Sequence, residues 1–230
     1  PAVLWGICLC FGADAAHAAR WNAPLPTNVN LEQWRTLPSG AWTTGALQSN
    51  NSDYGEGETV PFRLDVSALD NGSYDFEVCR QFENSGSYGY LVLAPYNTSR
   101  AADPGGTITS TSGSLSGVNV TVTVVLEDPR VRTCPEGAYV KTRVTIELNK
   151  ANSSDPAYVL WGARLAKPGD AIPGTDPVEY VPAGKGASSF PGGSLSMTIV
   201  PANKNVGIQT NSIAPTAADL LAFRAARREA

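Results

Sequence analysis

The sequence predicts an all-β protein, an antiparallel β-sandwich of Ig-like or jelly-roll type with roughly seven to nine strands. Three observations support this prediction. Apolar and polar residues alternate with a period of two along several runs, residues typical of turns separate the runs, and helical periodicity is nearly absent before the C-terminal end. The chain of 230 residues is long enough to bury a substantial core in one large β-domain.

Five runs show the alternation clearly, and each is expected to form a half-buried antiparallel strand. They are residues 60–66, 73–78, 118–126, 140–148 and 195–199. Two further runs, residues 88–93 and 158–165, are apolar almost throughout and are expected to be central strands.

The segments between the runs carry turn and loop residues. Asp70-Asn71-Gly72 separates the first two runs, and because Asn-Gly supplies the positive φ angles of a tight hairpin, a hairpin is expected there. Residues 107–117 are rich in Ser, Thr and Gly and predict an exposed loop. Residues 166–193 hold five prolines and little periodicity. A loop of this length usually binds or covers something, and a surface excursion without a partner is the alternative.

The N-terminal residues 1–18 have two interpretations. Residues 2–11 are apolar and Ala16-His17-Ala18 has the small-x-small form of a signal peptidase site, which predicts an export signal cleaved before Ala19. The apolar run is too short to span a bilayer. If the segment is retained, it is expected to act as a donor strand, in which large side chains alternate with small ones. The large residues are Val3, Trp5, Ile7, Leu9 and Phe11.

Cysteine usage agrees with export. Once the leader is removed, only Cys79 and Cys134 remain, and two cysteines in an exported chain predict one disulfide. Such a bridge would close a loop of about 55 residues and stabilise the fold by about 4 kcal/mol in the chain-entropy model. The alternative is a pair of buried free thiols.

The sequence contains no recognisable catalytic or cofactor motif, and we predict that the protein is not an enzyme and binds no cofactor. His17, the single histidine, lies in the presumed leader, which excludes a Ser-His-Asp triad and a His-ligated zinc site from the mature chain. A glycosidase would need two carboxylates in a cleft. The strand carboxylates are Glu77, Glu127 and Glu147, and Glu77 and Glu147 alternate opposite the apolar face, which favours solvated positions.

A nucleic-acid role is not expected, because the net charge is -4 and the only basic cluster is Arg224, Arg227 and Arg228 at the C-terminal end. Glycans are a possible partner. Five Asn-x-Ser/Thr sequons fall in turns or on polar strand faces, where a sugar would not be buried. They begin at Asn50, Asn71, Asn97, Asn119 and Asn152.

Two features suggest ligand binding and have simpler explanations. Aromatic side chains can stack on sugar rings, although core packing is commoner in sandwiches. These side chains are Trp21, Trp34, Trp42, Trp161, Tyr88, Tyr90 and Tyr96. The acidic residues 53–58 (DYGEGE) could offer oxygen ligands to Ca²⁺, but they lack the spacing of a known calcium loop and favour a solvated turn.

Residues 42–63, WTTGALQSNNSDYGEGETVPFR, resemble a pattern that recurs in large, uncharacterised exported bacterial proteins. Residues 159–166 (VLWGARLA), 184–195 (GKGASSFPGGSL) and 205–213 (NVGIQTNSI) resemble the same group in the same order. The resemblance implies a secreted β-rich module of surface or matrix proteins without an assigned activity. The group's acidic and His-bearing positions near residues 86–90 and Ala163 are Ser, Tyr and Ala-Arg here, so no ligand role is carried over.

Residues 215–230 are expected to lie beyond the sandwich domain of residues 19–214. The segment 218–230 resembles the first strand of a further Ig- or fibronectin-like module, and Leu221, Phe223 and Ala225 alternate as an interaction strand requires. The pattern is also compatible with a helix capped at Thr216.

These observations favour a non-enzymatic structural protein of the cell surface or extracellular space, a pilus-like filament subunit or an adhesin. It is expected to form a head-to-tail homopolymer by β-strand addition, with the N-terminal or the C-terminal segment as donor. The alternative is a carbohydrate- or Ca²⁺-binding module of a larger secreted protein. An unpaired strand slot favours the first function, and an exposed row of aromatic side chains favours the second.

Overall fold

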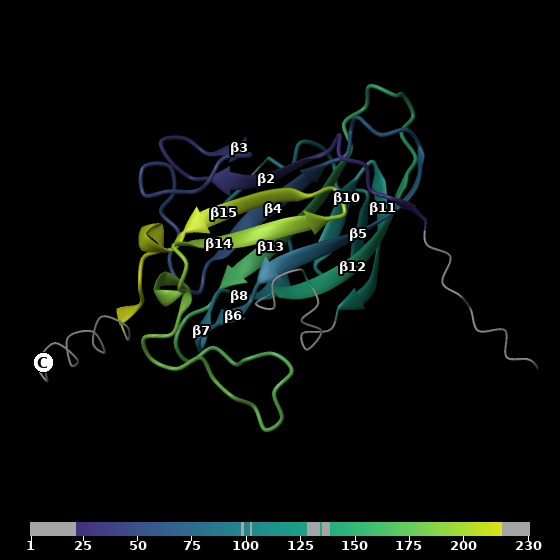
Figure 1. Ribbon diagram of the computed structural model, residues 1–230. Helices are drawn as coiled ribbons and strands as arrows, with labels where there is room; N and C mark the ends of the chain where they lie inside the picture. Colours follow the sequence, from purple (N-terminus) through teal and green to yellow (C-terminus); the bar gives the residue numbers. More distant parts are fainter. Residues whose placement is uncertain (1–21, 98, 102, 128–133, 135–138, 218–230) are drawn as a thin grey trace, which may run out of the picture.

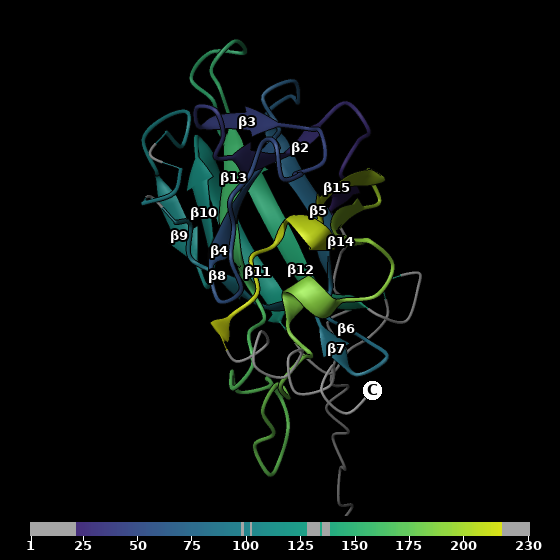
Figure 2. The same cartoon turned by 90° about the vertical axis from the view of Figure 1, so that its left-hand side faces the viewer.

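The computed structural model describes residues 22–97, 99–101, 103–127, 134 and 139–217. Within them the chain forms fifteen strands and two short 3-10 helices, and two antiparallel sheets pack face to face (Figure 1, Figure 2). The predicted all-β sandwich is confirmed. The strands outnumber the expected seven to nine because several have two or three residues. These are β1 (Ala23–Pro24), β3 (Ala41–Thr43), β6 (Glu83–Asn84), β7 (Ser87–Tyr88) and β9 (Ser110–Ser112).

The first sheet, called here the β5 sheet, has the strand order β11-β12-β5-β14-β15, and β1 pairs with β5 in parallel. Its long strands are β11 (Val120–Glu127), β12 (Tyr139–Leu148), β5 (Gly72–Gln81), β14 (Ser194–Val200) and β15 (Lys204–Gln209). Three of the expected strands, residues 73–78, 140–148 and 195–199, lie within β5, β12 and β14.

The second sheet, called here the β13 sheet, has the order β3-β2-β4-β13-β10-β9, and β8 also pairs with β13. Its remaining strands are β2 (Asn30–Arg35), β4 (Thr59–Asp65), β13 (Tyr158–Leu165), β10 (Leu115–Val118) and β8 (Tyr90–Ala94). Most residues of β13 are buried on both faces, which explains why residues 158–165 are apolar almost throughout.

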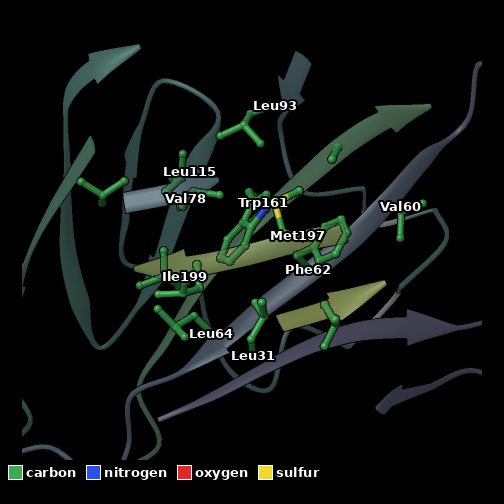
Figure 3. Packing of buried hydrophobic residues seen from close by; sticks show 14 of the residues in the cluster. Leu31, Val60, Phe62, Leu64, Val78, Leu93, Leu115, Trp161, Met197 and Ile199 are labelled. Carbon is green, nitrogen blue, oxygen red and sulfur yellow. The ribbon is translucent and has the colours of Figure 1, made fainter. Parts of the chain in front are cut away.

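The core lies between the sheets and consists of the alternating residues of both. Phe62 of β4 and Trp161 of β13 stack at 5.8 Å with an interplanar angle of 11°. Val78 and Met197 of the β5 sheet lie close to them in Figure 3. Burial of each such side chain contributes about 1.5–3 kcal/mol. The apolar residues of the period-two pattern therefore lie on the face of each strand that packs against the opposite sheet.

The run 118–126, expected to be one strand, is two strands in different sheets. β10 ends at Val118 in the β13 sheet, and β11 begins at Val120 in the β5 sheet. Asn119 between them has φ of 52°, and its side-chain amide donates a 2.8 Å hydrogen bond to Pro156 O. This left-handed residue redirects the chain, so Val118 packs outside the main core while Val120 packs inside it.

The expected hairpin at residues 70–72 is wrong, because β4 and β5 lie in different sheets. The Asn71 carboxamide oxygen accepts a hydrogen bond from Lys150 N at 2.8 Å, and its amide donates to Lys150 O at 3.0 Å. These bonds hold the turn against the chain that follows β12. β5 consequently pairs along its whole length with β12 instead of folding back on β4.

Three other segments differ from or refine the expectation. Residues 107–117 are not simply a loop but include the β9–β10 hairpin, with a turn at Gly113 where φ is 56°. The run 88–93 is interrupted between β7 and β8 at Gly89, where a Cβ would lie 2.7 Å from Gln81 O. Residues 166–193 form a long loop whose Ile172 and Val181 pack against Phe82 and Val140, so this loop covers part of the sandwich.

The disulfide between Cys79 and Cys134 is confirmed, with sulfur atoms 2.00 Å apart and Cα atoms 6.1 Å apart. Both cysteines are buried, and Val200 of β14 packs against them. The bridge spans 55 residues of sequence and ties β5 to the segment between β11 and β12.

The two ends of the described chain lie at opposite ends of the sandwich (Figure 1). Residue 22 enters beside β5. At the other end, Ala214 N donates to Tyr54 O at 2.9 Å and Thr216 N donates to the Glu56 carboxylate at 3.1 Å. Among the residues that the structure describes, no helix has the length and apolarity that crossing a bilayer requires.

Candidate functional site

The most informative surface is one edge of β5. On that side β14 pairs with β5 only through four register pairs, from Val200 opposite Glu77 to Met197 opposite Arg80. The chain then turns at Pro201 into β15. β14 leaves part of this β5 edge unpaired, at Tyr74 and Asp75, and this part is called here the β5 gap. β1 fills it in parallel, and Leu25 N donates to Asp75 O at 3.1 Å.

Asn22 secures β1 through the side chain of Asp75. Asp75 Oδ2 accepts a hydrogen bond from Asn22 N at 3.0 Å, and Oδ1 accepts from Asn22 Nδ2 at 3.1 Å and from Thr145 Oγ1 at 2.6 Å. Burial of the carboxyl opposes its ionisation, but the bonds from Thr145 and Asn22 and the charge of Arg143 outweigh burial. They hold the pKa of Asp75 below its ordinary value, so the acceptor is a carboxylate at neutral pH.

A groove of about 330 Å³ lies beside β1, between this strand and the turn that joins β14 to β15. It is lined by Asn22, Pro24, Asp75, Phe76, Glu77, Val200 and Pro201. The surface that it exposes is almost entirely apolar. A groove of this kind suits an extended peptide with an apolar side chain.

The edges of β8, β11 and β15 are covered by hydrogen bonds from side chains or from a neighbouring loop. On the free edge of β8, Leu91 O accepts a hydrogen bond from Arg80 Nη2 at 3.3 Å, and Leu93 O accepts one from Ser114 Oγ at 3.0 Å. These groups would otherwise be ready to pair with a further strand.

Serine side chains of β9 cover the edge of β11. Ser110 Oγ donates to Val120 O at 2.5 Å and accepts from Val122 N at 3.2 Å, and Ser112 Oγ accepts from Val124 N at 3.1 Å. The two sheets are thus joined along one side of the sandwich without a continuous ladder.

The opposite side is joined through β15. Gly207 O accepts hydrogen bonds from Leu47 N at 2.8 Å and from Gln33 Nε2 at 2.7 Å, and Gln209 N donates to Leu47 O at 2.9 Å. Because Gln33 belongs to β2, its fully buried side chain bridges the two sheets. Strand addition at this edge would have to displace these bonds.

The aromatic side chains considered for sugar stacking lie in several different environments. Trp161 and Tyr90 are fully buried in the core, and Tyr88 packs on Phe82. Trp21 lies outside the described residues. Only Trp34, Trp42 and Tyr96 gather on the outside of the β13 sheet, together with Tyr158, which the sequence analysis did not include.

The rings of this outer cluster are occupied by the protein itself. The Arg63 guanidinium lies 4.6 Å from the Trp42 ring centroid and 4.4 Å from that of Tyr158, and it pairs with Glu32 at 2.7 Å. At Gly105, whose φ is 83°, a Cβ would lie 2.5 Å from the Tyr158 ring and 2.8 Å from the Arg63 guanidinium. The loop backbone therefore lies directly over the cluster, which forms a small secondary core.

The acidic segment 53–58 is likewise engaged. Asp53 pairs with Arg100 at 3.2 Å, and Glu58 pairs with the same guanidinium. Glu56 accepts hydrogen bonds from Ser188 N at 3.0 Å, from Ser188 Oγ at 2.7 Å and from Thr216 N. Across the described ranges, no three or more His, Cys, Asp or Glu side chains are grouped to hold a metal ion.

The remaining candidate residues do not form one site. Glu77 pairs with Lys141 at 2.9 Å, Glu147 is exposed, and the side chain of Glu127 lies outside the described part. The no-enzyme interpretation stays a prediction.

Four of the five sequon asparagines use their side chains in the fold. Asn71 and Asn119 bind main-chain atoms as described above, Asn97 accepts from Ser99, and Asn152 donates to Asp155 at 3.3 Å. Asn50 is exposed and makes no such bond among the described residues. Glycosylation at any of them remains a prediction.

The donor-strand candidates Val3, Trp5, Ile7, Leu9, Phe11, Leu221, Phe223 and Ala225 lie outside the described residues, as does His17. The β5 gap, Asn22 and the edge-covering serines were not found from the sequence. Comparisons with protein-family models, with curated proteins and with solved structures found no match.

Proposed function

We propose that this chain is a non-enzymatic structural protein of the cell exterior, a filament subunit or adhesin that associates head to tail with copies of itself by β-strand addition. One observation carries the proposal. The edge of β5 is left incomplete by β14, and a segment from the N-terminal side of the domain completes it as β1. Such a gap is what an added strand requires.

The covered strand edges limit the places where a strand of another copy can pair. Side chains cover the edges of β8 and β11, and the main chain of Leu47 with the side chain of Gln33 covers that of β15, so pairing there would first break existing hydrogen bonds. The described chain also enters and leaves at opposite ends of the sandwich. A contact between one end and the other is heterologous, and a heterologous contact produces a fibre when its rotation does not close.

An extracellular location is supported by the Cys79–Cys134 disulfide, because disulfides persist in oxidising compartments. The carbohydrate- and calcium-binding alternative has less support. The outer aromatic rings contact Arg63 and the loop at Gly105, and the carboxylates of residues 53–58 are paired within the protein.

The test is the behaviour of the purified chain over a concentration series, followed by light scattering and electron microscopy. We expect linear assemblies whose length grows with concentration. Deletion of residues 1–25, which removes β1 together with the chain before it, and of residues 216–230, made separately, identifies a contribution of either end. A parent chain that stays monomeric at high concentration, or two truncated chains that both assemble like the parent, would refute assembly by a donated terminal strand.

A further inference from the structure

β1 is attached to the sandwich by few interactions. It has two residues, and its pairing with β5 is supplemented by Leu25 N on Asp75 O and by the two bonds from Asn22 to the Asp75 carboxylate. Ala23 and Pro24 are exposed, and only Leu25 is buried in the core. The segment is thus held mainly by contacts that any identical domain could supply.

The chain beyond β1 has the form of a connecting arm. Pro26, Thr27 and Asn28 are exposed, and Val29 is buried again just before β2 begins in the other sheet. Proline at position 26 removes a main-chain donor and favours an extended backbone. Residues 26–28 therefore join an element of the β5 sheet to the β13 sheet without being packed themselves.

β1 does not occupy all of the space at the β5 gap, because the groove remains open beside it. It extends from Pro24 to Val200 and Pro201, at the point where β1 and β14 meet along β5. An incoming strand that approaches from another molecule can make initial contact there, before the resident β1 leaves.

We infer that the acceptor of strand addition is the β5 gap and that the donor is residues 22–25 of a second copy of this chain. This inference rests on the function proposed above. It places donor and acceptor at the same end of the sandwich, and a linear assembly then requires each copy to donate to the next instead of back to its own donor. In the assembly, Asn22 of one copy bonds Asp75 of the next, and Leu25 of the donor enters the neighbour's core. Every contact of β1 is kept while its partner changes, which is why exchange of an identical element is a low-cost route to association.

The test uses two chains of different size, both carrying Cys8→Ser and Cys10→Ser and both keeping the Cys79–Cys134 bridge, so that each has one free cysteine. One carries Ala23→Cys and the other, with a size tag, carries Tyr74→Cys; these positions are opposite each other in the β1–β5 pairing. When β1 remains in its own domain, the two cysteines stay on different molecules. When β1 is exchanged, oxidation of the mixed chains gives a covalent pair of mixed size on a non-reducing gel.

The matched control is the pair Thr121→Cys and Glu147→Cys, which are register partners within β11 and β12. Mixed chains carrying these substitutions should give at most background cross-linking, because no proposed exchange moves β11 or β12. We expect the mixed band of the 23/74 pair to exceed that background at least tenfold and to grow with concentration.

The outcomes separate the inference from the proposed function. If assemblies form but the 23/74 pair cross-links no more than the 121/147 pair, the exchange of residues 22–25 is refuted while assembly by another contact stands. If no assembly forms at any concentration, the proposed function is refuted and the inference with it. A mixed band that rises with assembly supports both.

Discussion

Asn22 and Asp75, 53 residues apart in the sequence, are joined by two hydrogen bonds, one from the main-chain nitrogen of Asn22 to Oδ2 and one from its side-chain amide to Oδ1. The Thr145 hydroxyl of β12 donates to the same carboxylate. One buried side chain thereby connects the entering chain, the central strand β5 and its neighbour.

Asn cannot ionise, so replacing Asp75 by Asn should remove the pH dependence that this carboxyl gives to the free energy of unfolding. Because the pKa of Asp75 in the folded protein is below its ordinary value, its stabilising effect is present above the ordinary value and is lost as the pH falls through the folded one. We expect the parent to exceed Asp75→Asn in free energy of unfolding by about 1.5–3 kcal/mol near neutral pH.

The measurement is urea unfolding of both proteins between about pH 7 and pH 2, across the range in which carboxyl groups titrate. The difference should shrink below about pH 4. Asp70→Asn, at an exposed position in the turn before β5, is the control and should change stability by less than about 0.5 kcal/mol. If the difference in free energy of unfolding between the parent and Asp75→Asn stays constant over the whole pH range, the lowered pKa of Asp75 is contradicted.

Removing the disulfide should lower the free energy of unfolding by about 4 kcal/mol, as expected for a closed loop of about 55 residues. The variant is Cys79→Ser with Cys134→Ser, compared with a Cys8→Ser, Cys10→Ser chain that keeps the bridge. Thermal unfolding with and without a reducing agent measures the effect. If the reductant breaks the bond and the thermal midpoint of the bridged chain does not fall, the prediction is wrong.

The serine cover of β11 should contribute to both stability and solubility. Ser110→Ala leaves Val122 N without its acceptor and Val120 O without a donor, and should cost about 1–3 kcal/mol. Thr121→Ala, at an exposed position of β11, is the control and should be nearly neutral. Light scattering of the two variants compares their tendency to aggregate, and equal scattering would mean that Ser110 does not protect the edge.

Arg63 should stabilise the aromatic cluster outside the β13 sheet through its planar guanidinium. Arg63→Met removes two cation–π contacts and the Glu32 ion pair and should cost about 1–3 kcal/mol. Arg63→Lys keeps the charge but not the planar stacking, so an intermediate loss is expected. Arg35→Met is the control on β2. Tryptophan fluorescence should report a changed environment of Trp42 in the Arg63 variants only.

The sequence predicted the fold class and several strands because alternation is a local property. β4 and β14 each repeat their apolar residues with period two over the length of the strand, and β12 does so from Val144 to Leu148; the structure places those residues in the core. The disulfide was predicted by elimination, since only two cysteines lie outside residues 1–18.

The errors arose where the decisive contact is distant in sequence. Alternation continues through Val118 and Val120, and nothing in it reveals the positive φ of Asn119 that moves the chain between sheets. The turn at Asn71 looked like a hairpin because its bonds to Lys150, 79 positions away, are invisible in a local pattern. Likewise, no local signal in the run 73–78 connects Asp75 with Asn22, 53 positions away.

The Cys79–Cys134 bridge has a consequence for a molecule under tension. The described chain leaves the sandwich at opposite ends, so a pulling force is transmitted through the domain from the Asn22–Asp75 bonds to the Glu56–Thr216 bond. If the domain yields, the 55 residues between the cysteines cannot be drawn out. At about 3.3–3.6 Å per residue, the bridge withholds about 190 Å of contour length from each yielding domain. A row of such domains would therefore lengthen in limited steps and keep the end of β5 and the strands β6 to β11 within the closed loop, ready for refolding when the force is released.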